Sequence, residues 1–259
     1  MKFFSIILLF VIFNSTELKP VKQFTASTEN VFTDALGNIY SINGNNIVSY
    51  NLEGQKLFSY SNSFLGNISL IDVTDPMRIL LYYKEFNKIV FLSNKLSEIG
   101  SPIELDNAGF EQVSVCCSSN SGGVWIFDSQ SLQLKHLNSN LEADRKGTII
   151  QSVFNKSENI AFRLIEENDQ IYMSVPKTGL LVFDKFGVYK KLIPIIDINY
   201  FQVIGDKIIY LSKNKLCSYS IIDNIEIQSL PMNLEIKSVS VYKNILVASS
   251  KDEIFIYNL

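Results

Sequence analysis

The sequence predicts an all-β fold, a six-bladed β-propeller built from four-stranded blades. One observation is a pair of apolar residues that recurs about every 40 residues, a period typical of propeller blades. A second is the length of the apolar runs, which are shorter than a typical helix of about 11 residues and end at polar turns. A third is their content of β-branched and aromatic residues, which favour strands. The six copies of the pair are Ile39-Tyr40, Leu81-Tyr82, Val124-Trp125, Ile171-Tyr172, Ile209-Tyr210 and Leu246-Val247.

Each repeat divides into four expected strands in the same order. A first strand such as Val31-Phe32-Thr33 precedes the recurrent pair, and the pair itself lies in the second strand. The third strand ends in an aromatic and a polar residue, as in Tyr50-Asn51, and an irregular fourth strand such as Leu57–Tyr60 follows. The second strand Ile208–Leu211 is apolar at every position. That pattern indicates a strand covered on both faces, as blades stacked around an axis require.

The two ends of the repeat region predict how the ring closes. The last repeat reaches Leu259 just after its third strand, and Pro20–Thr25 precedes the first repeat without a place in it. We expect this segment to supply the missing outer strand of the last blade, which leaves no edge unpaired. The expected organisation is a signal peptide at 1–15 and a single propeller domain at 16–259.

The first residues have the pattern of an export signal. Met1-Lys2 is a positive start, and Phe3–Phe13 is an almost unbroken apolar run. Such a run rises about 16 Å as a helix, well short of the roughly 30 Å hydrocarbon core of a bilayer. A secretory signal is therefore expected rather than a membrane span. No cysteine follows the run, so we expect an exported, periplasmic protein without a lipid anchor and without a direct membrane span.

Composition and charge exclude several classes of function. The chain is 47% hydrophobic, which is enough for a large core and argues against intrinsic disorder. Its 23 basic and 26 acidic residues are scattered, with no basic stripe, so no nucleic-acid partner is expected. Cys116, Cys117 and Cys217 are expected to be small buried hydrophobes, with a disulfide from Cys217 to one of the pair as the alternative.

No motif for catalysis or metal binding is present. His136 is the single histidine, expected at the surface or between blades, and one histidine cannot build a typical zinc site. Asp72 with Asp75 is expected to cap a turn, and Glu166-Glu167 with Asp169 to form a solvated loop. We therefore expect no enzymatic activity, no metal and no cofactor.

Polar residues that interrupt the first strands are the candidates for a binding site, because first strands line the channel of a propeller. Arg163, flanked by apolar residues, either satisfies backbone carbonyls along the channel or anchors an anion or carboxylate on the axis. Gln202 interrupts another first strand. Asp72 precedes the second repeat's turn, and Tyr83 and Phe86 are aromatic residues near strand ends that suit partner contacts. These five form the predicted ligand- or partner-binding set.

Two stretches carry a resemblance to known families. Asp34-x-x-Gly37-Asn38-Ile39-Tyr40, followed by Asn45-x-Ile47-x-x-Tyr50-Asn51-x-x-Gly54, resembles the blade motif of NHL-type and related six-bladed propellers. The stretch from Asp72 to Leu92, together with Lys177–Asp184, is similar to an exported bacterial propeller family of lineages that use type 9 secretion. That resemblance implies an interaction protein rather than an enzyme.

Three functions are therefore considered, in order of preference. The first is a non-catalytic protein–protein interaction module, an accessory subunit of an outer-membrane or periplasmic assembly. Its family-based form is a plug on a type 9 translocon. The partner would be a protein such as an outer-membrane β-barrel, and the chain alone would be monomeric. The alternative is a carbohydrate- or peptide-binding protein, or a hydrolase, that uses the axial pocket. A sensor ectodomain is a third and weaker option.

Overall fold

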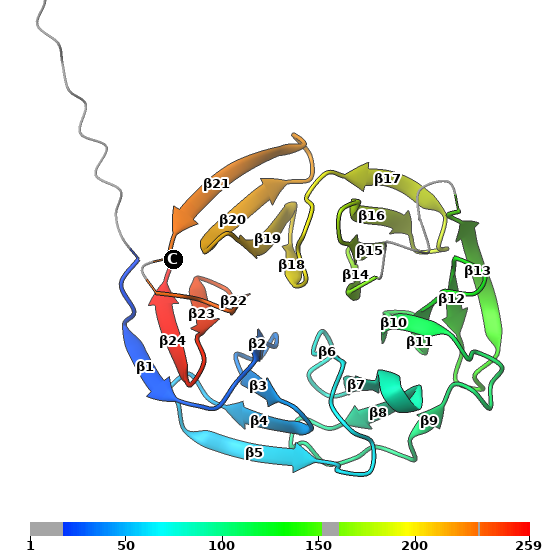
Figure 1. Cartoon of the computed structure of the whole chain (residues 1–259), viewed down its shortest axis with the longest axis horizontal. Coiled ribbons are helices and arrows are strands. Elements are labelled where there is room, and N and C mark those ends of the chain that lie inside the picture. Colours follow the sequence, from blue (N-terminus) through cyan, green and yellow to red (C-terminus); the bar gives the residue numbers. More distant parts are fainter. Residues whose placement is uncertain (1–17, 152–160, 233) are drawn as a thin grey trace, which may run out of the picture.

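The computed structural model describes residues 18–151, 161–232 and 234–259. The expected signal peptide at 1–15 lies outside these residues. Six four-stranded antiparallel sheets stand around a central axis like the blades of a propeller (Figure 1). The predicted fold class is confirmed.

All six blades share one plan, in which the first strand lies nearest the axis and the last lies at the rim (Figure 1). Blade I is β2 (Asn30–Thr33), β3 (Ile39–Asn43), β4 (Asn46–Tyr50) and β5 (Lys56–Ser61). Blade II is β6 (Leu70–Asp72), β7 (Ile79–Tyr83), β8 (Lys88–Leu92) and β9 (Ile103–Glu104), with the short 3₁₀ helix η1 (Lys84–Phe86) between β7 and β8. Blade III is β10 (Val113–Ser118), β11 (Val124–Asp128), β12 (Gln133–Leu137) and β13 (Ala143–Ile149). Blade IV is β14 (Arg163–Glu167), β15 (Gln170–Val175), β16 (Gly179–Asp184) and β17 (Tyr189–Ile193). Blade V is β18 (Phe201–Ile204), β19 (Lys207–Ser212), β20 (Lys215–Ser220) and β21 (Ile225–Pro231), and blade VI is β22 (Ser238–Tyr242), β23 (Ile245–Ser249), β24 (Glu253–Asn258) and β1 (Lys22–Thr25).

Blade VI is completed by the N-terminal strand, as predicted. β1 pairs antiparallel with β24, with Lys22 opposite Ile256 and Thr25 opposite Glu253. Phe24 contacts the ring of Tyr50 in blade I, with the centroids 5.2 Å apart. The outer strand of the last blade therefore binds both its own sheet and the neighbouring blade.

The recurrent pair fills the space between blades, which explains why it repeats. Tyr40, Tyr82, Trp125 and Tyr172 are all buried in second strands. Blade V departs from the pattern in one respect: Ile208 and Tyr210 are buried, whereas Ile209 and Leu211 are half-buried. Ile209 lines a lateral groove between blades V and VI, so this strand is covered less completely on one face than its apolar sequence predicts.

The ring has two faces that differ in the turns they carry. We call face A the side with the turns that join first to second strands and third to fourth strands, such as 34–38 and 51–55. Face B carries the turns between second and third strands and the loops between blades, such as 84–87 and 62–69. Each first strand runs from face B to face A.

Candidate functional site

The motif that resembles NHL-type blades is a structural turn. Asp34 is buried, and its Oδ1 accepts hydrogen bonds from the backbone N–H groups of Leu36 and Asn38, both at 2.9 Å. Its Oδ2 accepts from the Asn38 amide at 2.8 Å and from the Tyr40 hydroxyl at 2.9 Å. Gly37 has φ +87°, a left-handed conformation that glycine adopts without strain. The Asp-x-x-Gly-Asn-Ile-Tyr pattern therefore fixes the turn and orients the buried tyrosine.

Most polar residues of the first strands hold neighbouring blades together, at contacts that we call seams. At the seam between blades VI and I, Ser238 Oγ accepts from Val31 N at 2.8 Å and Ser240 Oγ accepts from Thr33 N at 2.9 Å. The Thr33 and Ser240 hydroxyls also share a hydrogen bond of 2.8 Å. The first strands of neighbouring blades do not pair through their backbones, and these serine side chains supply hydrogen bonds between the two sheets instead.

Gln202 forms a similar seam between blades V and VI. Its Oε1 accepts from Val241 N at 2.6 Å, and its Nε2 donates to Val241 O at 3.3 Å. The side-chain amide thus bonds to both the N–H and the C=O of Val241, as a residue of a paired strand would. Gln202 also lines the axial pocket described below.

Asp72 and Glu166 are buried carboxylates at two further seams. Asp72 Oδ1 accepts from the backbone and hydroxyl of Thr74, and its Oδ2 accepts from Ser118 N of blade III at 2.8 Å. Glu166 Oε2 accepts from Trp125 Nε1 at 3.1 Å and from Asn120 N at 3.0 Å. Asp72 caps a turn, as expected, and also links two blades.

The expected solvated loop at Glu166, Glu167 and Asp169 is wrong for Glu166. β14 extends to Glu167, and its side chains alternate between two directions. Glu166 points into the seam with blade III, whereas Glu167 lines the axial pocket. Asp169 lies in the turn that follows and is exposed. A buried tryptophan needs a hydrogen-bond acceptor for its indole N–H, so Trp125 was the signal that could have placed an acidic residue in this seam.

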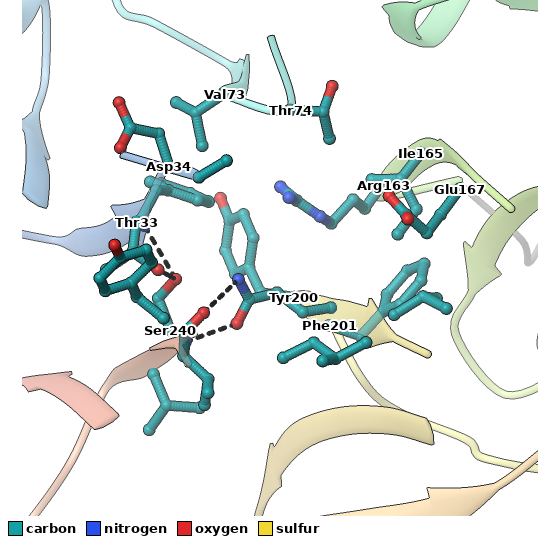
Figure 2. A pocket seen from close by; sticks show the side chains of 18 of the residues that line it. Thr33, Asp34, Val73, Thr74, Arg163, Ile165, Glu167, Tyr200, Phe201 and Ser240 are labelled. Carbon is teal, nitrogen blue, oxygen red and sulfur yellow. Dashed lines mark hydrogen bonds between the residues drawn. The ribbon is translucent and has the colours of Figure 1, made fainter. Parts of the chain in front are cut away.

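An axial pocket of about 300 Å³ lies where the first strands of blades I, IV, V and VI converge (Figure 2). Arg163 and Tyr200 line its end toward face B, and Asp34, Glu167 and Lys243 line its end toward face A. The wall between them is mainly apolar. It includes Val73, Ile165, Phe201, Val203 and Val241.

Arg163 extends across this pocket toward Tyr200 (Figure 2). The residue is 6% exposed, and its guanidinium carbon lies 5.3 Å from the centroid of Phe32 and 5.7 Å from that of Tyr200. Nη1 donates to the carbonyl of Ile71 at 3.4 Å. Among the described residues, Nε has no hydrogen-bond partner. The weak bond to Ile71 O agrees with a role in satisfying backbone carbonyls. The unpartnered Nε agrees with the other option, an anchor for an anion or carboxylate.

The pocket shifts the pKa values of its ionisable groups. Burial lowers the pKa of Arg163, and the nearby charge of Asp72 opposes that shift. Burial raises the pKa of Glu167, and Asp72 raises it further. Burial also raises the pKa of Tyr200, with partial compensation from Arg163. Burial is the largest cause in all three cases, so the pocket disfavours the charged forms of these groups.

The two predicted aromatic anchors have different surroundings. Tyr83 is fully buried in blade II at 0% exposure, so it belongs to the core and offers no surface to a partner. Phe86 is 45% exposed in η1 on face B. Phe64, in the neighbouring loop of face B, is 87% exposed. The five predicted site residues therefore do not form one site. Arg163 and Gln202 line the axial pocket, whereas Asp72 lies in the seam between blades II and III. Tyr83 lies in the core, and Phe86 lies on the surface.

The remaining candidates for chemistry are structural. His136 is buried on the face of blade III that carries Trp125, with Nδ1 2.6 Å from Asp144 Oδ1 and Nε2 2.7 Å from Gly122 O. Cys116, Cys117 and Cys217 are buried, and no disulfide joins them. Within the described ranges, no three histidine, cysteine or carboxylate side chains come together as a metal site. None of the helices among the described residues has the length and apolarity needed to cross a membrane.

Fold and site together define the class of protein: a closed six-bladed β-propeller with an axial pocket. No family model matches the sequence, and no curated protein matches it. Solved structures with a similar fold include three from different organisms. They are virginiamycin B lyase from Staphylococcus aureus (TM-score 0.61, 11% identity, 92% of this chain and 98% of that one), the Pan2 WD40 domain from Neurospora crassa (0.60, 9%, 92% and 80%) and BamB from Moraxella catarrhalis (0.57, 9%, 93% and 100%).

At sequence identities this low, the structural similarity establishes only the fold. An enzyme stands among these structures beside a WD40 domain, so the likeness does not decide whether this chain is catalytic. The function has to be argued from the surface and the pocket of this chain.

Proposed function

We propose that this protein is a non-catalytic, exported interaction module that serves as an accessory subunit of an outer-membrane or periplasmic assembly. The observation that carries the proposal is the pair of exposed aromatic side chains on face B, Phe64 and Phe86. Aromatic residues, phenylalanine included, are enriched in protein–protein interfaces, and exposed apolar side chains that lie together mark interaction sites.

The two aromatic side chains lie on adjoining segments. Gly66 belongs to the loop that carries Phe64, and it lies against the ring of Phe86 in η1. If Gly66 were alanine, its Cβ would be 3.4 Å from that ring. Ser69 Oγ accepts from Lys84 N at 3.1 Å and ties the same two segments together. A rigid pair of loops presenting two phenyl rings suits a protein partner that docks on this face.

The family-based form of the proposal is a plug on a type 9 translocon. Its support is the resemblance of the stretch from Asp72 to Leu92, which includes Phe86, and of Lys177–Asp184 to exported propellers of lineages that use that system. The expected partner is an outer-membrane β-barrel protein.

The test is a comparison of envelope complexes. The tagged mature protein is recovered from detergent-solubilised envelopes beside two double variants. Phe64→Ser with Phe86→Ser alters face B, and Phe186→Ser with Ile222→Ser alters exposed apolar residues on face A. A stoichiometric outer-membrane barrel that accompanies the native chain and the face A variant, but not the face B variant, is the expected result. A native chain that emerges alone, or equal recovery with both variants, contradicts the proposal.

The alternative function uses the axial pocket, and Arg163 favours its ligand-binding form. The hydrolase form has weaker support. Glycoside hydrolysis requires two carboxylates with separate roles, and both oxygens of Asp34 are already occupied by the turn, so Glu167 stands alone.

A further inference from the structure

The guanidinium of Arg163 is a buried cation with unused hydrogen-bonding capacity. In the part of the chain that the structure describes, no carboxylate lies within ion-pair distance of it, and Nε has no partner. Asp72 supplies a favourable field, but its oxygens are occupied by Thr74 and Ser118. A buried charge in this condition costs stability, so its presence calls for another explanation.

The surroundings of Arg163 hold the guanidinium in place. Phe32 and Tyr200 contact it from blades I and V, and Ile71 O accepts from Nη1. A planar guanidinium with free donors matches the two oxygens of a carboxylate. Because the rings already restrict the side chain, little conformational freedom remains to be lost when a ligand binds.

Charge in the pocket favours a monoanion over a phosphate. Asp72 lies close enough to Arg163 to affect its pKa, and Glu167 lines the same wall. A doubly charged phosphate would meet both carboxylates, whereas a single carboxylate adds one charge beside one cation. The volume of about 300 Å³ is at the small end of ligand pockets, and the wall beyond Arg163 is apolar.

We propose that the axial pocket binds a monocarboxylate with a compact apolar body. Its carboxylate pairs with Arg163, and its apolar part lies against Ile165 and Val241. This site is independent of the interaction surface on face B. The carboxylate belongs either to a free small acid or to the C-terminus of a peptide, and the test separates these sources.

Calorimetric titration of the mature protein with matched pairs tests the proposal. The first pair is phenylacetate and phenylacetamide. The second is acetyl-Ala-Ala-Leu with a free and with an amidated C-terminus. We expect saturable binding of at least one acid and at least tenfold weaker binding of its amide. Binding of phenylacetate identifies a small acid as the source, and binding of the peptide acid alone identifies a C-terminus. Absence of binding by both acids, or equal binding of acid and amide, overturns the proposal.

Two variants locate the binding. Arg163→Met removes the cation, and Ile165→Phe fills the pocket while leaving the guanidinium in place. Each should weaken binding of the acid at least tenfold, whereas the surface control Phe186→Ser should leave it unchanged. Thermal melts establish that each variant is folded, and Ile165→Phe decides the matter if Arg163→Met is not. Native-like binding by a folded pocket variant overturns the assignment.

Discussion

The seams between blades and the axial pocket both bury polar side chains from the same first strands, yet they treat them differently. At the seams, Ser240, Gln202 and Glu166 each accept a hydrogen bond from the neighbouring blade. In the pocket, Arg163 has one weak contact and a free Nε. The difference teaches that burial of a polar group does not reveal its role, whereas the completeness of its hydrogen bonding does.

Removal of β1 should have the largest effect, because it strips blade VI of its outer strand. Deletion of residues 16–27 exposes the edge of β24 and removes the contact of Phe24 with Tyr50. We expect a fall in melting temperature of roughly 10 °C or more, on the scale of about 2–4 °C per kcal/mol for a domain of this size. Calorimetry measures it, with Val21→Ser as the exposed control. An unchanged melt would contradict closure by β1.

Glu166→Ala should have the next largest effect. It leaves the N–H groups of Trp125 and Asn120 without their acceptor inside the seam. An unsatisfied buried donor costs about 1–3 kcal/mol, and the partly buried N–H of Asn120 adds about 1 kcal/mol, so the total loss should be about 2–4 kcal/mol. Urea unfolding measures the change. Glu166→Gln, which retains an acceptor, should lose less, and equal stability of Glu166→Ala and the native chain would show that this seam contributes nothing.

Two serine substitutions compare a satisfied with an unsatisfied hydroxyl. Ser240→Ala removes the acceptor of Thr33 N and should cost about 1–2 kcal/mol. Ser114→Ala removes a buried hydroxyl without a partner among the described residues and should cost nothing measurable. Paired denaturant melts of the two variants give the answer. A larger loss from Ser114→Ala would reverse the distinction between satisfied and unsatisfied hydroxyls.

Arg163→Met should stabilise the fold or leave it unchanged, in contrast to the seam variants. Replacement of a poorly paired buried charge by a side chain of similar length is often neutral or gains about 1 kcal/mol. The measurement is the free energy of unfolding without added ligand. A loss as large as that of Glu166→Ala would make Arg163 a structural residue.

Glu167→Gln should produce the smallest change, and its size depends on pH. Burial and Asp72 raise the pKa of Glu167 in the folded chain above its unfolded value. Ionised Glu167 therefore destabilises the fold once the pH is above the folded pKa, and that penalty disappears below the unfolded pKa. The variant should be slightly more stable than the native chain at neutral pH and equal to it in acid. Melting curves across pH would show a gap that closes on acidification; a gap that widens would reject the account.

The six blades could be predicted from the sequence because the pattern that marks each one is local and repeated. Tyr40 and its counterparts mark each second strand, and the position of Pro20–Thr25 outside any repeat predicts the closing strand. The position of Arg163 near the axis could be predicted because it lies in the first strand of its blade. Its neighbours Phe32 and Tyr200 come from other blades, so their approach depends on the tertiary arrangement and has no local pattern.

The errors also have physical causes. Glu166 and Glu167 are adjacent acidic residues that look like one solvated run, yet strand alternation sends one into a seam and the other into the pocket. Tyr83 stands beside the exposed Phe86 in the chain and is nevertheless fully buried. A change of one to three residues along a strand end reverses the environment, and a single sequence does not resolve that difference.

The pairing of β1 with β24 has a kinetic consequence. The two strands come from opposite ends of the repeat region, so the ring cannot close until the last blade has been synthesised. Blades I to V can form in order as the chain appears, but blade VI must wait for a strand made first. Closing so long a loop carries an entropic cost that earlier hairpins do not. Closure of the ring is therefore expected to be the last step of folding.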